Sequence, residues 1–315
     1  MIEYSSSNIM RGTNPHDTTK LNTGRVKMNK TSIEWVRNPD GTRGYTWNPI
    51  TGCLNHVNGM CKGGNFPCYS YKLANGILKE RYLANQNVAP YPDSYSTADI
   101  KARHKTLGPF HPRFWPERLG ELTKHRKPVG VAVCDMGELF GDWIPQEWQD
   151  KIFEAIRACP QHRFYLLTKQ PQNLPRFSPF PENCWVGVTI TKHKFLADAL
   201  VYLPKVEAKV KYLSLEPLLG GVTLKPQDIK LMGLNWLVIG SQTKPCKPPK
   251  AEWVQEIVET ADRAGVPVFL KDNLRPVLPY PWSEGKPLYD WVYTSKNGEV
   301  KFRQEMPDGT DKKGK

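Results

Sequence analysis

The segment VKYLSLEP, residues 210–217, is a short apolar run that ends in a glutamate and a proline. Five further runs rich in Val, Ile and Leu have the same form: VGVAVCDM (129–136), RFYLLTK (163–169), CWVGVTI (184–190), NWLVIGS (235–241) and VPVFLKD (266–272). Continuous apolar runs without alternation are typical of strands that are buried on both faces, as in a parallel sheet. Helix-length segments lie between several of them: PQEWQDKIFEAIRACP, HKFLADALVYLP and AEWVQEIVETADRAG. This alternation predicts an α/β fold, either an open doubly wound sheet or a barrel.

Polar residues follow every one of these runs, at the point where each predicted strand ends. They are Asp135 and Glu138, Thr168 and Lys169, Thr189 and Thr191, Ser214 and Glu216, Ser241 and Gln242, and Lys271 and Asp272. In α/β folds the carboxyl ends of the strands form the functional edge of the sheet. Loops are polar in any protein, so most of these residues are weak indicators when taken singly. Glu216 is a stronger one, because it follows a strand directly and precedes a rigid proline.

A second feature is the stretch WNPITGCLNHVNGMCKGGNFPCYSYKLA, residues 47–74, which holds three of the seven cysteines. In a reducing cytoplasm, Cys53, Cys61 and Cys68 indicate a metal site or a catalytic site rather than disulfides. Together with His56 they would make a reasonable structural zinc site. Without the histidine, three thiolates suit a four-iron cluster that keeps one iron open for a substrate or cofactor. The spacing alone leaves both metals open.

The remaining chain is divided by its composition. Residues 1–30 are polar, weakly basic and without periodicity, which predicts a disordered arm. A main domain is expected over 31–275, and within it TWNPITGC is predicted to be a short strand ending at the first of the three cysteines. A helix is predicted over 71–83. The extension 276–315 is predicted to hold a hairpin that turns at Lys296-Asn297-Gly298 and a frayed tail.

Bulk properties limit the classes of protein to which the chain can belong. With 315 residues and 39% hydrophobic content it can bury a large core. It has no apolar run of about 18 residues and no apolar signal region at its start, so a cytoplasmic protein without a membrane span is expected. No Walker loop, GxGxxG turn, HExxH motif or serine nucleophile elbow is present, which excludes most common enzyme classes. The catalytic residues stay unknown at this level.

The charge of the chain favours an anionic partner. Its formal net charge is +13 and its pI is about 9.3. Residues 101–127, KARHKTLGPFHPRFWPERLGELTKHRK, interleave basic groups with Phe and Trp, as in surfaces that bind phosphates and stack bases. A nucleic acid or nucleotide is therefore a candidate partner. Two alternatives are that the charges only keep the protein soluble, and that the aromatics form the core face of a short helix.

Ordered sequence blocks bear a family resemblance. SIEWVRNPDGTRGYTWNPITGC, then Cys61 and CYSYKLA, resembles the opening of the family named after the phage proteins Gp thirty-seven and Gp sixty-eight, within the radical S-adenosylmethionine (SAM) superfamily. The later blocks are HPRFWPERLGEL, VAVCDMGELFGDWIP, FYLLTKQPQNL, NCWVGVTI, YLSLEPLLGGV, NWLVIGSQTK and VPVFLKD. Together they cover residues 31–272. The resemblance implies a partial (β/α)6-type, TIM-like barrel. It also implies a phage-associated enzyme that reductively cleaves SAM to a 5′-deoxyadenosyl radical, with an electron donor such as a flavodoxin or ferredoxin.

The resemblance also implies ligands for a [4Fe–4S] cluster and for SAM. Its cluster-binding cysteines match Cys53, Cys61 and Cys68, and the aromatic residue that follows the third matches Tyr69. Its other implied cofactor contacts fall at two places. Met136, Gly137 and Glu138 are expected at the SAM amino group, and Thr189, Ser214 and Glu216 at the ribose and methionine ends.

Two departures from the family pattern stand out. The gap from Cys61 to Cys68 is lengthened by the insert around KGGNFP, and the loop after NWLVIG reads SQTKPCKPP where the family has a turn with glycine and glutamate. Two other functions remain as alternatives. One is a non-catalytic nucleic-acid-binding protein with a Cys/His zinc site, and the other is a hydrolase or lyase that uses Glu216 and Lys271.

Overall fold

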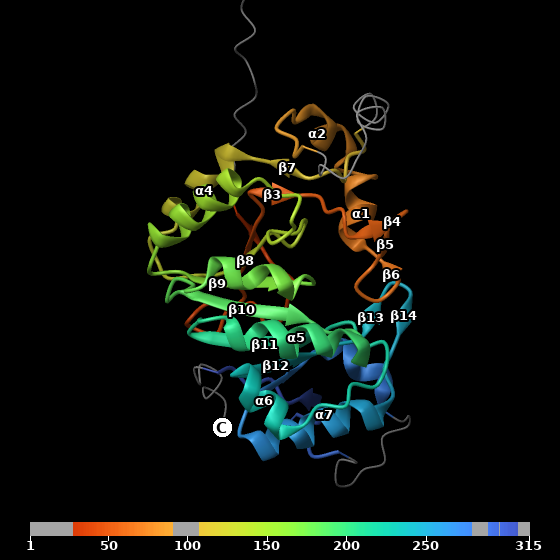
Figure 1. Cartoon of the computed structure of the whole chain (residues 1–315). Coiled ribbons are helices and arrows are strands. Elements are labelled where there is room, and N and C mark those ends of the chain that lie inside the picture. The colour runs from red at the N-terminus through yellow and green to blue at the C-terminus, as the bar shows by residue number, and fades with distance from the viewer. Residues whose placement is uncertain (1–27, 91–106, 279–288, 296, 308–315) are drawn as a thin grey trace, which may run out of the picture.

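The computed structural model describes residues 28–90, 107–278, 289–295 and 297–307, and it is built around one eight-stranded sheet (Figure 1). In sheet order the strands are β1 (Asn29–Lys30), β2 (Tyr45–Trp47), β8 (Gly130–Val133), β9 (Arg163–Thr168), β10 (Cys184–Thr189), β11 (Val210–Leu215), β12 (Trp236–Ile239) and β15 (Val268–Leu270). Every neighbouring pair from β2 to β15 is parallel, and β1 alone is antiparallel to its neighbour. All six predicted strands are present, so the prediction of an α/β fold with a mostly parallel sheet is confirmed.

The strands are arranged in the sheet in the same order as in the chain. A doubly wound sheet reverses its order at one point, and this sheet does not. Because crossovers between parallel strands are right-handed, an order without reversal places the connecting helices on one face. Four of them are α4 (Gln146–Arg157), α5 (Leu196–Tyr202), α6 (Pro226–Met232) and α7 (Ala251–Ala264). Within the described residues no ladder joins β1 to β15, so the sheet is not closed into a barrel.

Short helical segments complete the connections, and none of them was predicted separately. They are the 3₁₀ turns η1 (Pro116–Lys124), η2 (Pro171–Phe177), η3 (His193–Phe195), η4 (Leu203–Lys205) and η5 (Asp272–Val277). Among the described helices, none is both long enough and apolar enough to cross a membrane.

The two faces of the sheet are covered differently. The helical face buries the aliphatic core, whereas the other face carries a cluster of aromatic rings. Trp35 lies at the centre of this cluster, with its ring centroid 5.7 Å from those of Tyr165 and Tyr212 and 5.9 Å from that of Trp236. Gly187 makes room for the Tyr212 ring, since a Cβ atom at this glycine would stand 2.3 Å from it. The aromatic cluster therefore fills this face, and the polar strand ends lie beyond it.

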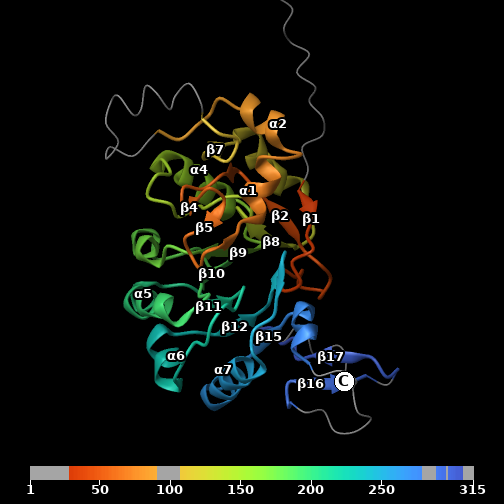
Figure 2. The ribbon, with the colours of Figure 1, turned by 90° about the vertical axis from the view of Figure 1, so that its right-hand side faces the viewer.

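The first and last described segments of the chain are attached to opposite edges of the sheet (Figure 2). Of the predicted arm, residues 1–27 lie outside the described residues. Residues 28–30 belong to the folded domain, because Met28 is buried and the strand β1 pairs with β2. At the other end, β16 (Val292–Thr294) and β17 (Val300–Phe302) form the predicted hairpin. The segment after it pairs with β15, where Glu305 N–H donates to Val268 O at 3.0 Å.

The cysteine region is a cap of small elements. These are β3 (Ile50–Thr51), β4 (His56–Val57), β5 (Met60–Cys61), β6 (Phe66–Pro67), α1 (Tyr69–Ala74), α2 (Lys79–Ala84) and β7 (Arg113–Phe114). The predicted strand before the first cysteine is divided into β2 and β3, and only β2 joins the main sheet. The single helix predicted over 71–83 is two helices, because Asn75 and Gly76 interrupt it and glycine is a poor helix former.

Candidate functional site

The cysteine loop docks on the carboxyl ends of two central strands. Thr191, just beyond β10, donates its hydroxyl hydrogen bond to Gly63 O at 2.6 Å. A Cβ atom at Gly63 would stand 2.7 Å from Lys169 Cδ, and one at Gly64 would stand 2.5 Å from Thr191 Oγ1. Gly64 also has a φ of 154°, so a side chain is disfavoured there, whereas the Lys169 side chain near Gly63 is flexible enough to move. The insert between Cys61 and Cys68 is therefore the part of the loop that contacts the sheet.

The three predicted metal-binding thiols lie in one electrostatic neighbourhood. Burial raises the pKa of Cys53, and the nearby Glu138, Cys61 and Cys68 raise it further. Burial also raises the pKa of the Cys61 thiol. Asn55 N–H donates to Cys53 Sγ at 3.2 Å. Within the described part of the chain, no three His, Cys, Asp or Glu side chains are grouped as a single metal ion requires.

His56, the fourth zinc ligand of the alternative interpretation, is engaged elsewhere. Its Nδ1 accepts a hydrogen bond from Gly59 N–H at 3.2 Å. Its ring packs against Tyr71 and Phe110, at centroid distances of 4.9 Å and 5.3 Å. The backbone of the loop therefore engages Nδ1, so this nitrogen is not placed to bind zinc.

Glu138 is a buried carboxylate at the end of β8. Its Oε1 accepts hydrogen bonds from Thr168 Oγ1 at 2.8 Å and from Phe140 N–H at 3.1 Å, and its Oε2 accepts one from Lys169 N–H at 3.4 Å. Burial raises the pKa of Glu138, although these hydrogen bonds and the Lys169 cation oppose the rise. The ends of β8 and β9 thus hold one carboxylate rigidly near the thiols.

A hydrogen-bond network links the cysteine loop to the predicted cofactor loop after β8. Tyr69 donates from its hydroxyl to Asp135 O at 2.6 Å. Asn48 Nδ2 donates to Asp135 Oδ1 at 2.6 Å, and Asn48 Oδ1 accepts from Met136 N–H at 2.9 Å. Gly137 lies against the backbone of the same cap, since its Cβ would stand 3.0 Å from Gly52 O. The structure thereby brings Tyr69, Met136 and Gly137 together beside the cysteine loop.

Among the described residues, three buried hydroxyls at neighbouring strand ends have no hydrogen-bond partner: those of Thr189, Ser214 and Ser241. Thr189 and Ser214 face each other in the register of β10 and β11, and both side chains are buried. Neither hydroxyl oxygen has a hydrogen-bond partner. They share the face of Gly187 and Tyr212, because alternate residues of a strand point the same way. Buried polar groups without a partner are rare, and one reason for them is an absent ligand or water.

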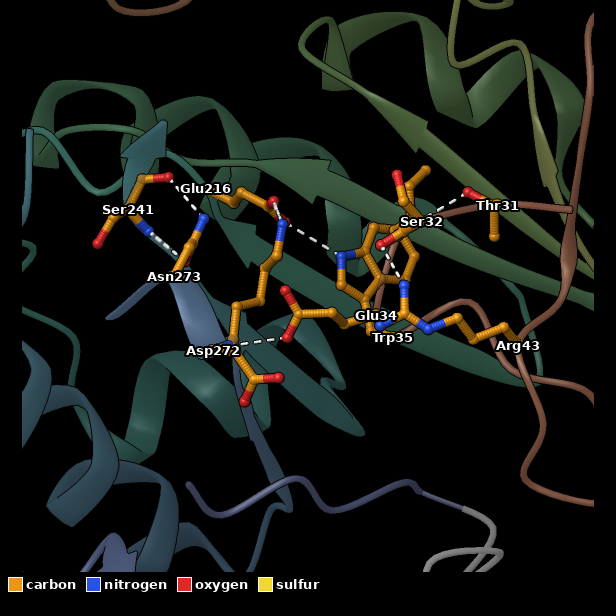
Figure 3. A network of polar contacts seen from close by, with 11 residues as sticks. Thr31, Ser32, Glu34, Trp35, Arg43, Glu216, Ser241, Asp272 and Asn273 are labelled. Atoms are coloured by element: carbon orange, nitrogen blue, oxygen red, sulfur yellow. Dashed lines mark hydrogen bonds and ion pairs between the residues drawn. The ribbon is translucent and has the colours of Figure 1, made fainter. Parts of the chain in front are cut away.

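Glu216 and Lys271 form an ion pair beside them (Figure 3). Trp35 Nε1–H donates to Glu216 Oε2 at 3.1 Å, and Glu34 Oε2 accepts from Asp272 N–H at 2.8 Å. Burial alone would lower the pKa of Lys271, but the contact with Glu216 outweighs it and raises the pKa. Glu216 therefore has a partner within the protein, in contrast to Thr189 and Ser214.

Beyond the sequence-predicted residues, the site includes three supporting side chains. Trp35 donates to Glu216, and Asn48 holds Asp135 and the backbone of Met136. Asn273 holds the Ser241 backbone, accepting from its N–H and donating to its carbonyl, each at 2.9 Å. All three precede or follow the strands by irregular intervals, so no periodicity marked them. A shallow surface depression lies apart from this site, next to the start of α7, and is lined in part by Lys250.

The described part of the predicted basic–aromatic segment is a buried support. Phe110, Phe114 and Trp115 are buried, and so is Arg113, whose guanidinium donates to the backbone carbonyls of Gly108 and His111 at 3.0 Å and 2.7 Å. These rings cannot stack bases, because they are already packed. The three rings are buried, as the alternative of a core face expected, but they lie on β7 and in the residues beside it and not on one face of a helix. Residues 101–106 lie outside the described residues.

Comparisons with known proteins place the chain in one family. Residues 30–275 match the family model whose description is "Protein of unknown function (DUF5131)". No curated protein and no solved structure matches the chain. The matched region contains the whole parallel sheet from β2 to β15 and the cysteine loop. Because the match covers well over half of its length, the chain belongs to the DUF5131 family.

Proposed function

We propose that this protein is a radical SAM enzyme that binds a [4Fe–4S] cluster through Cys53, Cys61 and Cys68. The observation that carries the proposal is the placement of the three-thiol loop over the carboxyl ends of the parallel strands, beside the buried carboxylate of Glu138. Functional groups of α/β enzymes gather at this edge. The sequence resemblance to the phage Gp thirty-seven and Gp sixty-eight family points to the same chemistry.

The strand order supports a partial (β/α)6-type barrel as the finer description of the fold. Strands in chain order with helices on one face are the arrangement of TIM-like barrels, in which the helices form the outer layer. In such a barrel the aromatic cluster around Trp35 would be the packed interior. The open edge between β1 and β15 would be the unclosed side.

The donor set fits an iron–sulfur cluster. Thiolates are the usual ligands of such clusters, and three of them leave one iron of a four-iron cluster for SAM. When bound and reduced, the cluster and SAM supply a 5′-deoxyadenosyl radical for hydrogen abstraction, and the protein contributes orientation and exclusion of water. The Cys53 thiol must lose its proton to bind iron, and burial opposes that loss until the metal arrives.

The residues around the loop have distinct roles in this proposal. Glu138 offers a fixed carboxylate to the SAM amino group, because its position is held by Thr168 and by two backbone N–H groups. The unpartnered hydroxyls of Thr189 and Ser214 offer hydrogen bonds to the ribose or methionine end. Glu216 has the indirect role of orienting Lys271 at the same edge. An electron donor such as a flavodoxin or ferredoxin would reduce the cluster.

The test is iron and sulfide analysis of the protein purified and reconstituted without oxygen. We expect about four irons per chain, a brown chromophore and cleavage of SAM to 5′-deoxyadenosine. Cys68→Ala should lose the chromophore and the cleavage, whereas Cys246→Ala should keep both, because Cys246 lies exposed on another hairpin. About one zinc per chain that is lost in His56→Ala would refute the proposal and favour the zinc-binding alternative.

A further inference from the structure

Three loops at the carboxyl edge of the sheet carry lysines and no acidic residues. Residues 53–68, 190–195 and 240–250 contain no Asp or Glu. Their lysines are Lys62, Lys192, Lys194, Lys244, Lys247 and Lys250. Five of the six are exposed and Lys192 is half-buried. In the described part of the chain none of the six is in an ion pair with a carboxylate. This set of lysines is called the basic edge below.

Three acidic residues near this edge are buried or paired, whereas Asp142, in the loop after β8, and Asp272, after β15, are exposed. Glu138 is buried and accepts three hydrogen bonds, and Asp135 is held by Asn48 and Tyr69. Glu216 is paired with Lys271. On the three loops themselves, the exposed charged side chains are all lysines. A surface of one sign attracts ligands of the opposite sign.

The three loops share one edge because the strands that precede them are parallel. In Figure 1 the arrow of β10 points toward the side of the molecule that carries β4–β6 and the hairpin of β13 (Gln242–Thr243) and β14 (Cys246–Lys247). The Thr191–Gly63 hydrogen bond connects the first two loops directly. One strand separates β10 from β12, so the loops that follow them start about 10 Å apart. The charges are thus spread over a strip wider than one phosphate group.

We infer that the basic edge binds the sugar–phosphate backbone of a nucleic acid and presents it to the site below. A strip of separated lysines fits a row of phosphates, whereas a small nucleotide would use only one or two of them. The rings of Phe110, Phe114 and Trp115 are buried, so the proposed contact is made by the basic edge and not by stacking on these rings. A nucleic acid would then be the substrate of the radical chemistry, and this part of the inference rests on the proposed function. The binding of the nucleic acid itself needs no cluster.

The experiment measures binding of a fluorescent 20-nucleotide single strand to the full-length protein by anisotropy over a salt series. The edge variant replaces four lysines by glutamine: Lys192, Lys194, Lys244 and Lys247. The matched control variant replaces four exposed lysines from loops or helices outside the basic edge: Lys127, Lys205, Lys209 and Lys230. Both variants lose the same positive charge, so a difference in their affinity for the oligonucleotide shows that the position of the lysines matters.

We expect the edge variant to bind at least tenfold more weakly at low salt. Its plot of log affinity against log salt should be shallower by about 0.7 for each lost phosphate contact, while the control variant keeps the wild-type slope. Equal loss in both variants, or no loss in the edge variant, would overturn the inference. So would competition by polyglutamate as strong as that by the oligonucleotide. Iron analysis of the same preparations tests the proposed function separately, because failure to bind iron leaves the anisotropy result unchanged.

Discussion

Replacing Lys271 by methionine tests whether the ion pair at the edge of the sheet stabilises the fold. The pair joins Lys271 to Glu216, whose second oxygen accepts a hydrogen bond from Trp35 Nε1–H at 3.1 Å. The two side chains are 13% and 22% exposed. Methionine preserves most of the side-chain volume and removes the charge. The carboxylate of Glu216 would then be left mostly buried without a cation.

The expected loss follows from the burial of the pair. Two unit charges about 4 Å apart attract each other by about 4 kcal/mol at an effective dielectric constant of 20. Breaking one partner of a buried pair costs about 3–5 kcal/mol. Glu216 retains part of its solvent contact and the hydrogen bond from Trp35, so the loss should lie near or below the lower limit, at about 2–3 kcal/mol. The pKa of Lys271 is raised above its ordinary 10.5, so the pair stabilises the fold below that pH and the stabilisation is lost as the pH rises through the raised value.

The assay is urea denaturation at pH 7, with Lys151→Met as the matched control. Lys151 pairs with Glu147 on α4 at 2.5 Å, but the two side chains are 47% and 73% exposed. This variant should lose only about 0.5 kcal/mol. Adding Glu216→Gln to Lys271→Met should restore part of the stability, because the neutral amide no longer needs a cation. A loss in Lys271→Met no larger than that in Lys151→Met would refute the reasoning.

Two further predictions concern the core. Gly187→Ala should lower the free energy of unfolding by about 1–3 kcal/mol, since the new Cβ would stand 2.3 Å from the Tyr212 ring. Gly120→Ala is the control, because a Cβ there has nothing within 4 Å to displace. The midpoints of urea denaturation compare the two variants. His162 accepts Val129 N–H at Nδ1 at 3.3 Å, and burial lowers its pKa below 6.5. Below that pH the unfolded chain binds a proton at His162 and the folded chain does not, so the free energy of unfolding should fall on acidification from pH 6.5. It should fall less in His162→Gln. Urea denaturation at pH 7 and pH 5.5 measures both losses, and equal losses in the two proteins would contradict the prediction.

The main sheet could be predicted because its strands are buried on both faces. Runs such as VKYLSLEP (210–217) carry that burial directly in their composition, and the helices between them are long enough to be periodic. The cap around the cysteines could not be predicted in the same way. Its strands are two residues long, so neither alternation nor length distinguishes them from loops. The single helix predicted over 71–83 was too long. The helix-like spacing of its apolar residues continues past Gly76, whereas the first helix of the structure ends at Ala74.

The site was predictable only in part, because its residues come from strand ends while their partners do not. Glu216 was identified from its place after a strand, but its contact with Trp35 joins residues 181 positions apart. The composition around Arg113 was compatible with both an exposed binding surface and a buried core. Basic and aromatic residues in alternation suggested a surface for nucleic acid, and in the structure the same residue types satisfy buried carbonyls and fill a core. Burial decides between these outcomes, and a local pattern does not encode it.

The long gap between Cys61 and Cys68 has a geometric explanation in the sheet. The loop leaves the sheet near β2, yet it contacts Thr191, which follows β10. Two strands lie between β2 and β10, so these strands are about 14 Å apart at a spacing of about 4.8 Å. Residues of the insert make this contact themselves, because Gly63 O accepts the hydrogen bond from Thr191 and Gly64 lies against the Thr191 side chain. The insert therefore extends the three-cysteine loop across the central strands, which is the position that a cluster serving a ligand at Thr189 and Ser214 would need.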